Sequence, residues 1–596
     1  MLRIDINFNK KEIFNQSILV LIIASLYFLS LHYPIYNGWD DKKYILENPY
    51  LSFSFSNVCL LFSKPYYHMY TPLTMLSYMF DYNVWGLNSC GYHLQNIFWH
   101  IIASIIVYKC FRLFEIKSWI AFFLCLIFAV HPQRVESVVW LSERKDVLCA
   151  AFYFLSIYYF LKSGTQHKRR NYTFSMLFYI FALLSKPMAV SLPVILLLYE
   201  FYRNKKDKRL ETVDCRLKKK RKKICGYKLG LSRLWPYFII LTVFIPLTTY
   251  SQALDNAGFR FSFRQLYVVL YNIKFYITTT IIPTYLNPIY PRISISDTIV
   301  STSVFYIATV FIIIFFSAKD KKFFLYYILS ILSCYIIALL PVVGIVPFSF
   351  CNYADRWSYI PTVFIWFAIG LILTRTLYKN NSKQSFLLNK QLIFALLVLY
   401  SVFLIILNYQ YQKVWENRRN IFLYASSSVP ANRIALKFLA DLELEQGNYV
   451  RVLKIADQLE EEDKGSLDPL YFKATVTYYL NKKKAIKQLL FIKPYYELIT
   501  RKGYDTEFRY LRILNMLIDT NYFVGNIQKA IEYINELLSF KHLSKNKRYF
   551  YHGVKAYCLK EYKTAILWFN KALELEPNNK KILGNIQFCL EAQKGE

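Results

Sequence analysis

Residues 17–33 read SILVLIIASLYFLSLHY and contain no acidic residue, lysine or arginine. An apolar run of this length can cross a bilayer as one helix. Roughly ten stretches that are long enough to cross, or nearly cross, a bilayer lie between residues 17 and 408. In lipid, each backbone polar group must be satisfied within its own segment, so these stretches predict helices. The sequence therefore predicts an all-α, polytopic membrane helix bundle.

The chain divides into an apolar part and a polar part. Its 596 residues are 55% hydrophobic and 19% aromatic, which suits a large membrane domain joined to one soluble domain. From about residue 430 the sequence becomes polar and helix-periodic. We predict a membrane domain at 1–425 and a helical repeat domain at 426–596. The first apolar stretch lacks a small-residue cleavage site and is expected to be an uncleaved signal anchor.

A strongly basic segment, 203–233, interrupts the apolar part. Its residues 203–228 hold 13 basic and three acidic side chains and supply much of the formal net charge of +34. Such a cluster could bind nucleic acid, but between two apolar stretches it is better explained as a cytoplasmic loop near anionic lipid. We therefore expect membrane lipids, and no nucleic acid, as its partners.

The distribution of lysine and arginine predicts the topology, because these residues concentrate in cytoplasmic loops. The basic, cytoplasmic segments are 1–12, 113–117, 162–170, 203–233, 319–322 and 375–390. The segments expected to face outward are 33–92, 131–146, 185–188, 250–298 and 341–358.

One apolar segment, 264–283, contains Arg264, Asn272 and Lys274. If it crossed the bilayer, the basic turn at 318–322 would fall outside, so we interpret it as an interfacial or re-entrant helix. That leaves about 11 spans, a cytoplasmic N-terminus and an extracytoplasmic tail.

The first outer loop, 33–92, is far longer than a connection requires, which favours a functional role. Asp40 and Asp41 follow the first span, where apolar walls can raise the basicity of a carboxylate. An ordinary acidic pair in a solvated loop is the alternative, since exposed aspartate is common.

The second outer loop, HPQRVESVVWLSERKDVL, concentrates charge between two apolar spans. Such density is costly unless the charges pair or meet a ligand, and a functional site and a structural ion network explain it equally well. The last outer loop adds two more charges at the head of a span. The candidate residues in these two loops are His131, Arg134, Glu136, Glu143, Arg144, Lys145, Asp146, Asp355 and Arg356.

The 11 cysteines are scattered, several of them within apolar stretches, and indicate neither a disulfide framework nor a metal site. No metal ligand and no resident cofactor are predicted, and a metal requirement stays open.

Five segments together resemble the transmembrane and TPR repeat-containing (TMTC) family and its bacterial relatives, within the GT-C class of membrane glycosyltransferases. They are WDD and ENP at 39–49, YTPLTMLSYMFDYNVWGLNSCGYHLQN at 70–96, HPQRVESVVWLSERKDVL at 131–148, LSKPMAVSLPVILLLYE at 184–200 and ADRWSYIP at 354–361. The resemblance runs along nearly the whole chain and implies a GT-C-like helix bundle. By analogy with the bacterial relatives, we expect this bundle to lie in a bacterial inner membrane.

The resemblance also implies an activity. GT-C enzymes move a sugar, here a mannose-type hexose, from a polyprenyl phosphate to a protein or glycan hydroxyl on the outer face. It implies an aspartate in the first outer loop as general base, and both Asp41, which we favour slightly, and Asp40 match. Arg144, Arg134 and Arg356 are the candidates for the donor phosphate, because guanidinium groups bind phosphate in a fork geometry. His131, Glu136, Asp146 and Asp355 are expected to support them.

The chain departs from the family at Arg134, where the family usually shows a histidine. An arginine there can replace a phosphate-binding cation, but it cannot replace a group that moves protons.

The tail shows the spacing of a helical repeat. Small and aromatic residues match a repeat of about 34 residues, and Ala530 lies 35 residues before Ala565. The matching positions are Gly553, Ala565, Phe569, Ala572 and Pro577. Stacked repeats are either a folding scaffold or a platform for an acceptor, and we favour the platform.

Two other functions remain open from the sequence. A non-catalytic membrane scaffold would use the tail to recruit partners and the outer-loop charges for structure. A transporter is less well supported, because the charges cluster in outer loops and not in the middle of spans.

Overall fold

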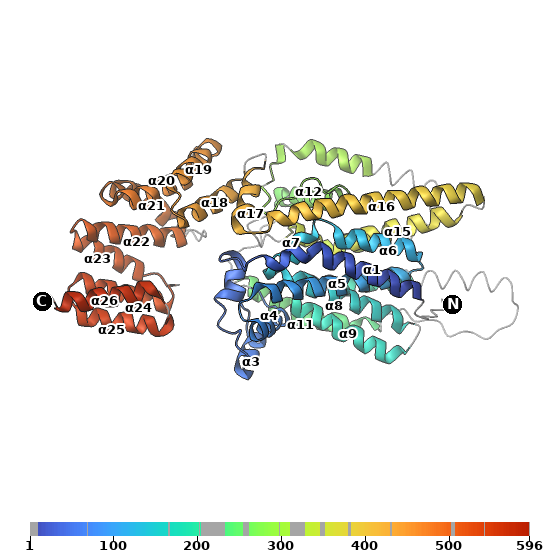
Figure 1. Ribbon diagram of the computed structural model, residues 1–596, viewed down its shortest axis with the longest axis horizontal. Helices are drawn as coiled ribbons and strands as arrows, with labels where there is room; N and C mark the ends of the chain where they lie inside the picture. Colours follow the sequence, from blue (N-terminus) through green and yellow to red (C-terminus); the bar gives the residue numbers. More distant parts are fainter. Residues whose placement is uncertain are drawn as a thin grey trace. The chain divides into compact units, whose positions relative to one another are not determined.

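The computed structural model describes most of the chain as helices (Figure 1). It describes residues 10–596 except 68, 165–166, 202, 204–232, 254–261, 292, 297, 310–327, 346–351, 380–382, 429–431, 502–506, 542, 578 and 595–596. Within these residues there is no strand, only an isolated bridge between Tyr66 and Met69. The predicted all-α class is confirmed. The basic turn at 318–322 and nearly all of the basic segment 203–233 lie outside the described residues.

The chain forms two compact units, Met1–Asn432 and Arg433–Glu596. The helices of the first unit are α1 (Lys10–Tyr27), η1 (Phe28–His32), α2 (Trp39–Asp41), η2 (Lys42–Leu46), α3 (Phe55–Ser63), α4 (Pro72–Trp85), α5 (Ser89–Leu113), α6 (Ser118–Val130), α7 (Arg134–Val139), η3 (Leu141–Glu143), α8 (Arg144–Ser163), α9 (Lys168–Ser185), η4 (Pro187–Ser191), α11 (Trp235–Ala253), α12 (Phe263–Ile281), α14 (Leu329–Leu339), η7 (Asp355–Ser358), α15 (Pro361–Lys379), α16 (Lys383–Val414) and α17 (Arg418–Ser426).

Among the residues described for this unit, four segments are long and apolar enough to cross a membrane: Lys10–His32, Ser89–Leu113, Leu141–Ser163 and Asn389–Val414. Shorter apolar helices accompany them, at Ser118–Val130, Pro187–Phe201, Trp235–Ser251, Thr298–Thr309, Leu329–Leu339 and Pro361–Leu377. The chain is an integral membrane protein. The total of about 11 spans remains a prediction.

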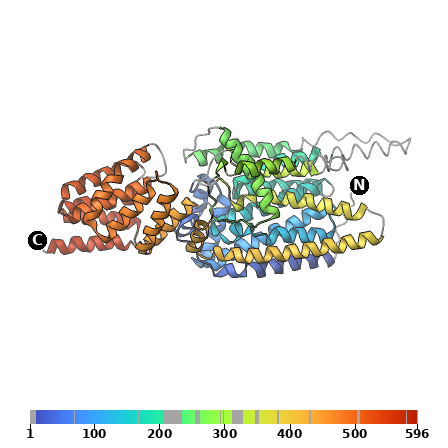
Figure 2. The ribbon, with the colours of Figure 1, turned by 90° about the horizontal axis from the view of Figure 1, so that it is seen from above.

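The long helices pack side by side into one bundle (Figures 1 and 2). Helix α8 packs against α5 and α9, and α6 packs against α5, α15 and α16. The approach of α15 to α6 depends on Gly370, because a Cβ there would lie 2.8 Å from the Cδ1 atoms of Ile116 and Leu124. A larger side chain would force the ends of the Ile116 and Leu124 side chains to shift, so glycine lets these helices pack without that rearrangement.

Helix α12 covers most of the segment that we expect to be interfacial. Its buried side chains, including Asn272 and Tyr276, lie on one face. The Asn272 amide donates to the carbonyl oxygens of Val343 and Asn352, each at 2.8 Å. Asn272 is thus turned into the protein, whereas Arg264 is exposed and Lys274 donates to the Ser301 hydroxyl at the surface; the position of α12 relative to a bilayer stays a prediction.

The second unit consists of consecutive helices, each packed on the next. They are α18 (Arg433–Glu445), α19 (Tyr449–Glu462), α20 (Asp468–Leu480), α21 (Lys482–Arg501), α22 (Glu507–Phe523), α23 (Ile527–Leu538), α24 (Lys545–Cys558), α25 (Tyr562–Leu575) and α26 (Lys580–Lys594).

The repeat positions found in the sequence lie inside this unit. Ala530, Ala565, Phe569 and Ala572 are buried. A Cβ on Gly553 would lie 2.7 Å from the Phe569 ring, which explains the small residue on α24 opposite α25. This arrangement is consistent with a TPR-like solenoid.

Candidate active site

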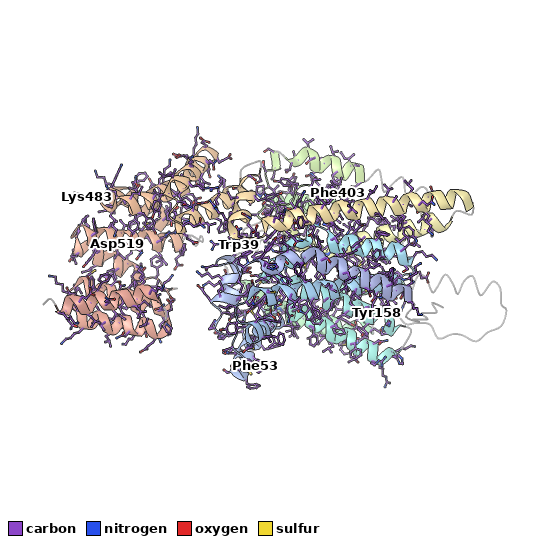
Figure 3. The ribbon with its side chains drawn as sticks, in the orientation of Figure 1. Trp39, Phe53, Tyr158, Phe403, Lys483 and Asp519 are labelled. Carbon is purple, nitrogen blue, oxygen red and sulfur yellow. The ribbon has the colours of Figure 1, made fainter. Side chains whose placement is uncertain are left out.

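The outer loops meet at one end of the bundle. Figure 3 labels Trp39 and Phe53 of the first outer loop at this end, and Tyr158 of α8 closer to the other end. Trp39 has a left-handed backbone, with φ of 54°. Its indole packs against Trp140 of the second outer loop and Phe422 of α17, with ring centroids 5.1 Å and 5.3 Å apart. This strained residue fixes the turn that carries the two aspartates.

Asp41 anchors the first outer loop to the second. It is fully buried, and its Oδ1 accepts hydrogen bonds from the backbone N–H of Ser142, at 3.0 Å, and from the Ser142 hydroxyl. Its Oδ2 accepts from the backbone N–H of Tyr36 at 3.3 Å. Burial raises the pKa of Asp41 to about 7, although these hydrogen bonds act in the opposite direction.

Asp40 points the other way and stays accessible. Its side chain is 33% exposed, and its Oδ2 lies 3.7 Å from Nζ of Lys145. The Lys145 ammonium also lies 5.2 Å from the centre of the Tyr44 ring. Asp40 is therefore a carboxylate that a substrate can reach, next to a positive charge.

Glu143 is the centre of a buried ion network. Its Oε1 accepts from Nζ of Lys145 at 3.1 Å and lies 3.4 Å from Nε of Arg356. Its Oε2 lies 3.4 Å from Nζ of Lys186. Two cations from different loops therefore converge on one carboxylate oxygen, a geometry that suits an anionic oxygen of a ligand equally well.

Arg356 connects η7 to the second outer loop. Its guanidinium pairs with Glu136, and its backbone N–H donates to Oε2 of Glu136 at 2.8 Å. The guanidinium carbon lies 5.5 Å from the ring centre of Trp140. Burial raises the pKa of Glu136 above its usual value, against the nearby charge of Arg356. With 13% of its side chain exposed, Arg356 is the most accessible of the three predicted arginines.

Asp146 and Lys186 close the network on the side of α9. Nζ of Lys186 lies 2.5 Å from Oδ1 of Asp146, and the Ser137 hydroxyl donates to Oδ2 at 3.3 Å. Both charged residues are buried. Lys186 immediately follows α9 and precedes Pro187 of η4, so the end of a helix positions it.

Arg144 lies in a different environment from Arg356. It is fully buried and forms an ion pair with Asp81 of α4. Its Nε donates to Oδ1 of Asn96 and its Nη2 to the carbonyl of Tyr92, both at 2.8 Å, while its guanidinium carbon lies 4.6 Å from the Tyr78 ring. This geometry joins α4 and α5 to the start of α8.

His131 and Arg134 lie deeper in the protein. His131 has its Nε2 3.1 Å from the carbonyl of Thr280, and its Nδ1 accepts from the backbone N–H of Gln133. Burial lowers the pKa of His131 well below its usual value, so the ring is neutral. Arg134 donates to the Ser358 hydroxyl at 2.5 Å and stacks 5.0 Å from the Tyr359 ring.

Asp355 is also buried. It accepts from the hydroxyls of Tyr290, at 2.8 Å, and Tyr411, at 3.4 Å. Burial, and then the charge of Glu136, raise the pKa of Asp355 well above its usual value. A buried carboxyl held by two tyrosines suits a supporting role.

The structure thus brings Asp40, Glu136, Asp146 and Arg356 to one network, and Asp41 binds the adjoining Ser142. His131, Arg134 and Asp355 lie deeper in the protein than that network. Arg144 forms a second cluster with Asp81 and Asn96. We did not predict roles for Ser142, Lys186, Asp81, Glu143 and Lys145, although the last two lie in the charged loop that the sequence identified. A lysine at the end of an apolar helix, in LSKP, was the available signal for Lys186.

Within the described ranges, no group of three or more histidine, cysteine, aspartate or glutamate residues has the arrangement of a metal site. The roles of all the residues above remain predictions, because the geometry shows contacts and not chemistry.

Comparison with known proteins points to one family. Residues 72–213 match the family described as dolichyl-phosphate-mannose-protein mannosyltransferase. This segment contains the second outer loop and Lys186, but not the first-loop aspartates or Arg356.

Curated relatives agree. Protein O-mannosyl-transferase TMTC3 from Mus musculus is 32% identical over 171 residues, which is 27% of this chain and 17% of the relative. Protein O-mannosyl-transferase F38B6.6 from Caenorhabditis elegans is 29% identical over 123 residues, or 20% of this chain and 17% of the relative. The aligned part is thus 17% of the length of each of these two relatives.

A crystal structure of ArnT from Cupriavidus metallidurans bound to undecaprenyl phosphate aligns with 89% of this chain and 80% of its own, at 11% identity and a TM-score of 0.31. That likeness is too low to support an argument. The sequence matches confirm the resemblance over about a quarter of the chain: in this part it is similar to protein O-mannosyl-transferases, TMTC3 among them.

Proposed function

We propose that the protein is a membrane glycosyltransferase that moves a mannose-type hexose from a polyprenyl phosphate to a protein or glycan hydroxyl on the extracytoplasmic face. The names of its relatives support the class of reaction. One observation supports the site: the accessible carboxylate of Asp40 lies beside Lys145, which shares Oε1 of Glu143 with Arg356.

Asp40 is the better candidate for the general base. A base must come within hydrogen-bonding reach of the hydroxyl that it deprotonates. Asp40 is one-third exposed, whereas Asp41 is buried and both its oxygens accept hydrogen bonds from the protein. We therefore assign Asp41 to positioning, and our slight preference for Asp41 from sequence is reversed.

Lys145 and Arg356 are the proposed ligands of the donor phosphate. Both cations lie within 3.4 Å of one Glu143 oxygen, and we propose that a phosphate oxygen takes the place of that carboxylate oxygen. Charge-assisted hydrogen bonds of this kind are short and strong. Arg144, in contrast, already has buried partners, and we assign it to the support of the outer loops.

The proposed reaction is a simple displacement. The acceptor hydroxyl gives its proton to Asp40 while its oxygen forms a bond to the anomeric carbon. The bond from that carbon to the phosphate oxygen breaks, and the polyprenyl phosphate leaves with its electron pair. Positive charge fixed at Lys145 and Arg356 stabilises the leaving group, and fixed charge is effective because it needs no reorganisation during the reaction.

Purified full-length protein, reconstituted in nanodiscs, tests this function. We expect transfer of labelled mannose from a polyprenyl-phosphate mannose to a hydroxyl-bearing peptide. Lys145→Met should raise the KM for the donor, with Lys64→Met, in the exposed part of the first outer loop, as a matched control. Absence of transfer with every lipid-linked hexose tried, from protein that binds partners through its tail, would favour the scaffold function instead.

A further inference from the structure

Lys186 contacts one carboxylate oxygen of Glu143, and the two proposed phosphate ligands contact the other. Its Nζ lies 3.4 Å from Oε2 of Glu143, whereas Lys145 and Arg356 contact Oε1. The same Nζ lies 2.5 Å from Oδ1 of Asp146. Lys186 therefore pairs with Glu143 and Asp146 and leaves Oε1 of Glu143 to Lys145 and Arg356.

Three cations face four carboxylates in this network. Lys145, Lys186 and Arg356 contact the buried carboxylates of Glu136, Glu143 and Asp146, and Lys145 also lies beside the more exposed Asp40. A buried carboxylate that loses its partner is costly, because it keeps the desolvation penalty without the attraction. If Lys145 and Arg356 both moved to a phosphate, Glu143 would depend on Lys186 alone.

We propose that Lys186 is a positioning residue that stays paired with Glu143 and Asp146 while Lys145 and Arg356 transfer to the donor phosphate. This inference rests on the proposed function. Lys186 does not touch the donor in this scheme. It makes the exchange of partners possible, because Glu143 remains neutralised after the two other cations leave.

A binding experiment on the full-length protein in detergent tests this role. Undecaprenyl phosphate is the probe, and the dissociation constant is measured for wild type, Lys186→Met, Lys186→Arg and Lys186→Met combined with Glu143→Gln. We expect Lys186→Met to weaken binding about tenfold or more, the scale of one charge-assisted contact. Lys186→Arg should keep most of the affinity.

The double variant separates charge balance from packing. Glu143→Gln removes the charge that Lys186 neutralises in the proposed exchange, so the double variant should regain a large part of the lost affinity. Lys168→Met, an exposed lysine at the other end of α9, is the matched control and should bind as wild type does. In transfer assays Lys186→Met should raise the KM for the donor more than it lowers kcat.

Three results would overturn the inference: wild-type affinity in Lys186→Met, equal losses in the single and double variants, or no binding of undecaprenyl phosphate by wild type. If wild type binds the lipid and the variants behave as expected, but no sugar is transferred, the inference stands and the proposed function fails.

Discussion

Arg144 and Arg356 show how far a side chain's environment decides its role. The sequence gives both as phosphate ligands, because both are arginines in charged outer loops. Arg144 is fully buried against Asp81, Asn96 and the Tyr78 ring. Arg356 keeps 13% of its side chain exposed beside Glu143. Arg144 is therefore a buried structural residue, whereas Arg356 is accessible enough to exchange Glu143 for a ligand.

The two arginines should therefore respond differently to substitution. Arg144→Ala leaves Asp81 buried without its counter-charge and should destabilise the protein by about 3 to 5 kcal/mol. Arg356→Ala should lower the melting temperature less, because Arg356 is partly exposed and Glu136 keeps its hydrogen bond from the backbone N–H of residue 356, and it should raise the KM for the donor. Thermal unfolding in detergent and donor titrations check both. Loss of donor affinity without loss of stability in Arg144→Ala would restore Arg144 to the donor site.

Asp41 should make stability depend on pH. Burial raises the pKa of Asp41 from 3.8 to about 7 in the folded protein. Between these values the folded protein holds a proton that the unfolded chain has lost, so stability falls as the pH rises through this window. Asp41→Asn lacks this contribution. Melting temperatures measured from pH 4 to pH 8 should thus fall more for wild type than for the variant, and parallel curves would contradict the assigned pKa.

At the scale of elements, the sequence predicted helices and loops well and their contacts poorly. Apolar length identified the bundle, and the charged loops near 40 and 131–146 lie together in the structure. The pairing of Lys186 with Asp146, and of Arg144 with Asp81, joins elements far apart in the chain. A single sequence cannot show such contacts, because local patterns carry information only about nearby residues.

The contact of α15 with α6 gives a prediction about elements. Gly370→Val would place a Cβ 2.8 Å from Ile116 and Leu124, and overpacking of this kind costs about 1 to 3 kcal/mol. Because α15 begins shortly after Arg356, its displacement should also weaken donor binding. Gly584→Ala, which meets nothing within 4 Å on α26, is the matched control. Equal melting temperatures for Gly370→Val and wild type would contradict the close packing of this pair.

At the scale of the whole molecule, a tail that presents the acceptor must lie on the same side of the membrane as the outer loops. We predict that a reporter fused after residue 596 is active only outside the cytoplasm, and that one inserted at residue 215 reports from the cytoplasm. Alkaline phosphatase and fluorescent-protein fusions measure these two states. Cytoplasmic signal from the tail fusion would show that 264–283 crosses the bilayer and would separate the repeats from the proposed active face.

The most direct test is the rate of sugar transfer by Asp40→Asn. Asparagine keeps the size of the side chain but cannot accept the acceptor's proton at neutral pH. Turnover should fall by about 10² to 10⁴, the usual contribution of a positioned base, while donor binding and the melting temperature persist. Asp41→Asn should lower turnover less and change the stability. Transfer by Asp40→Asn at the wild-type rate would contradict the assignment of Asp40 as the general base.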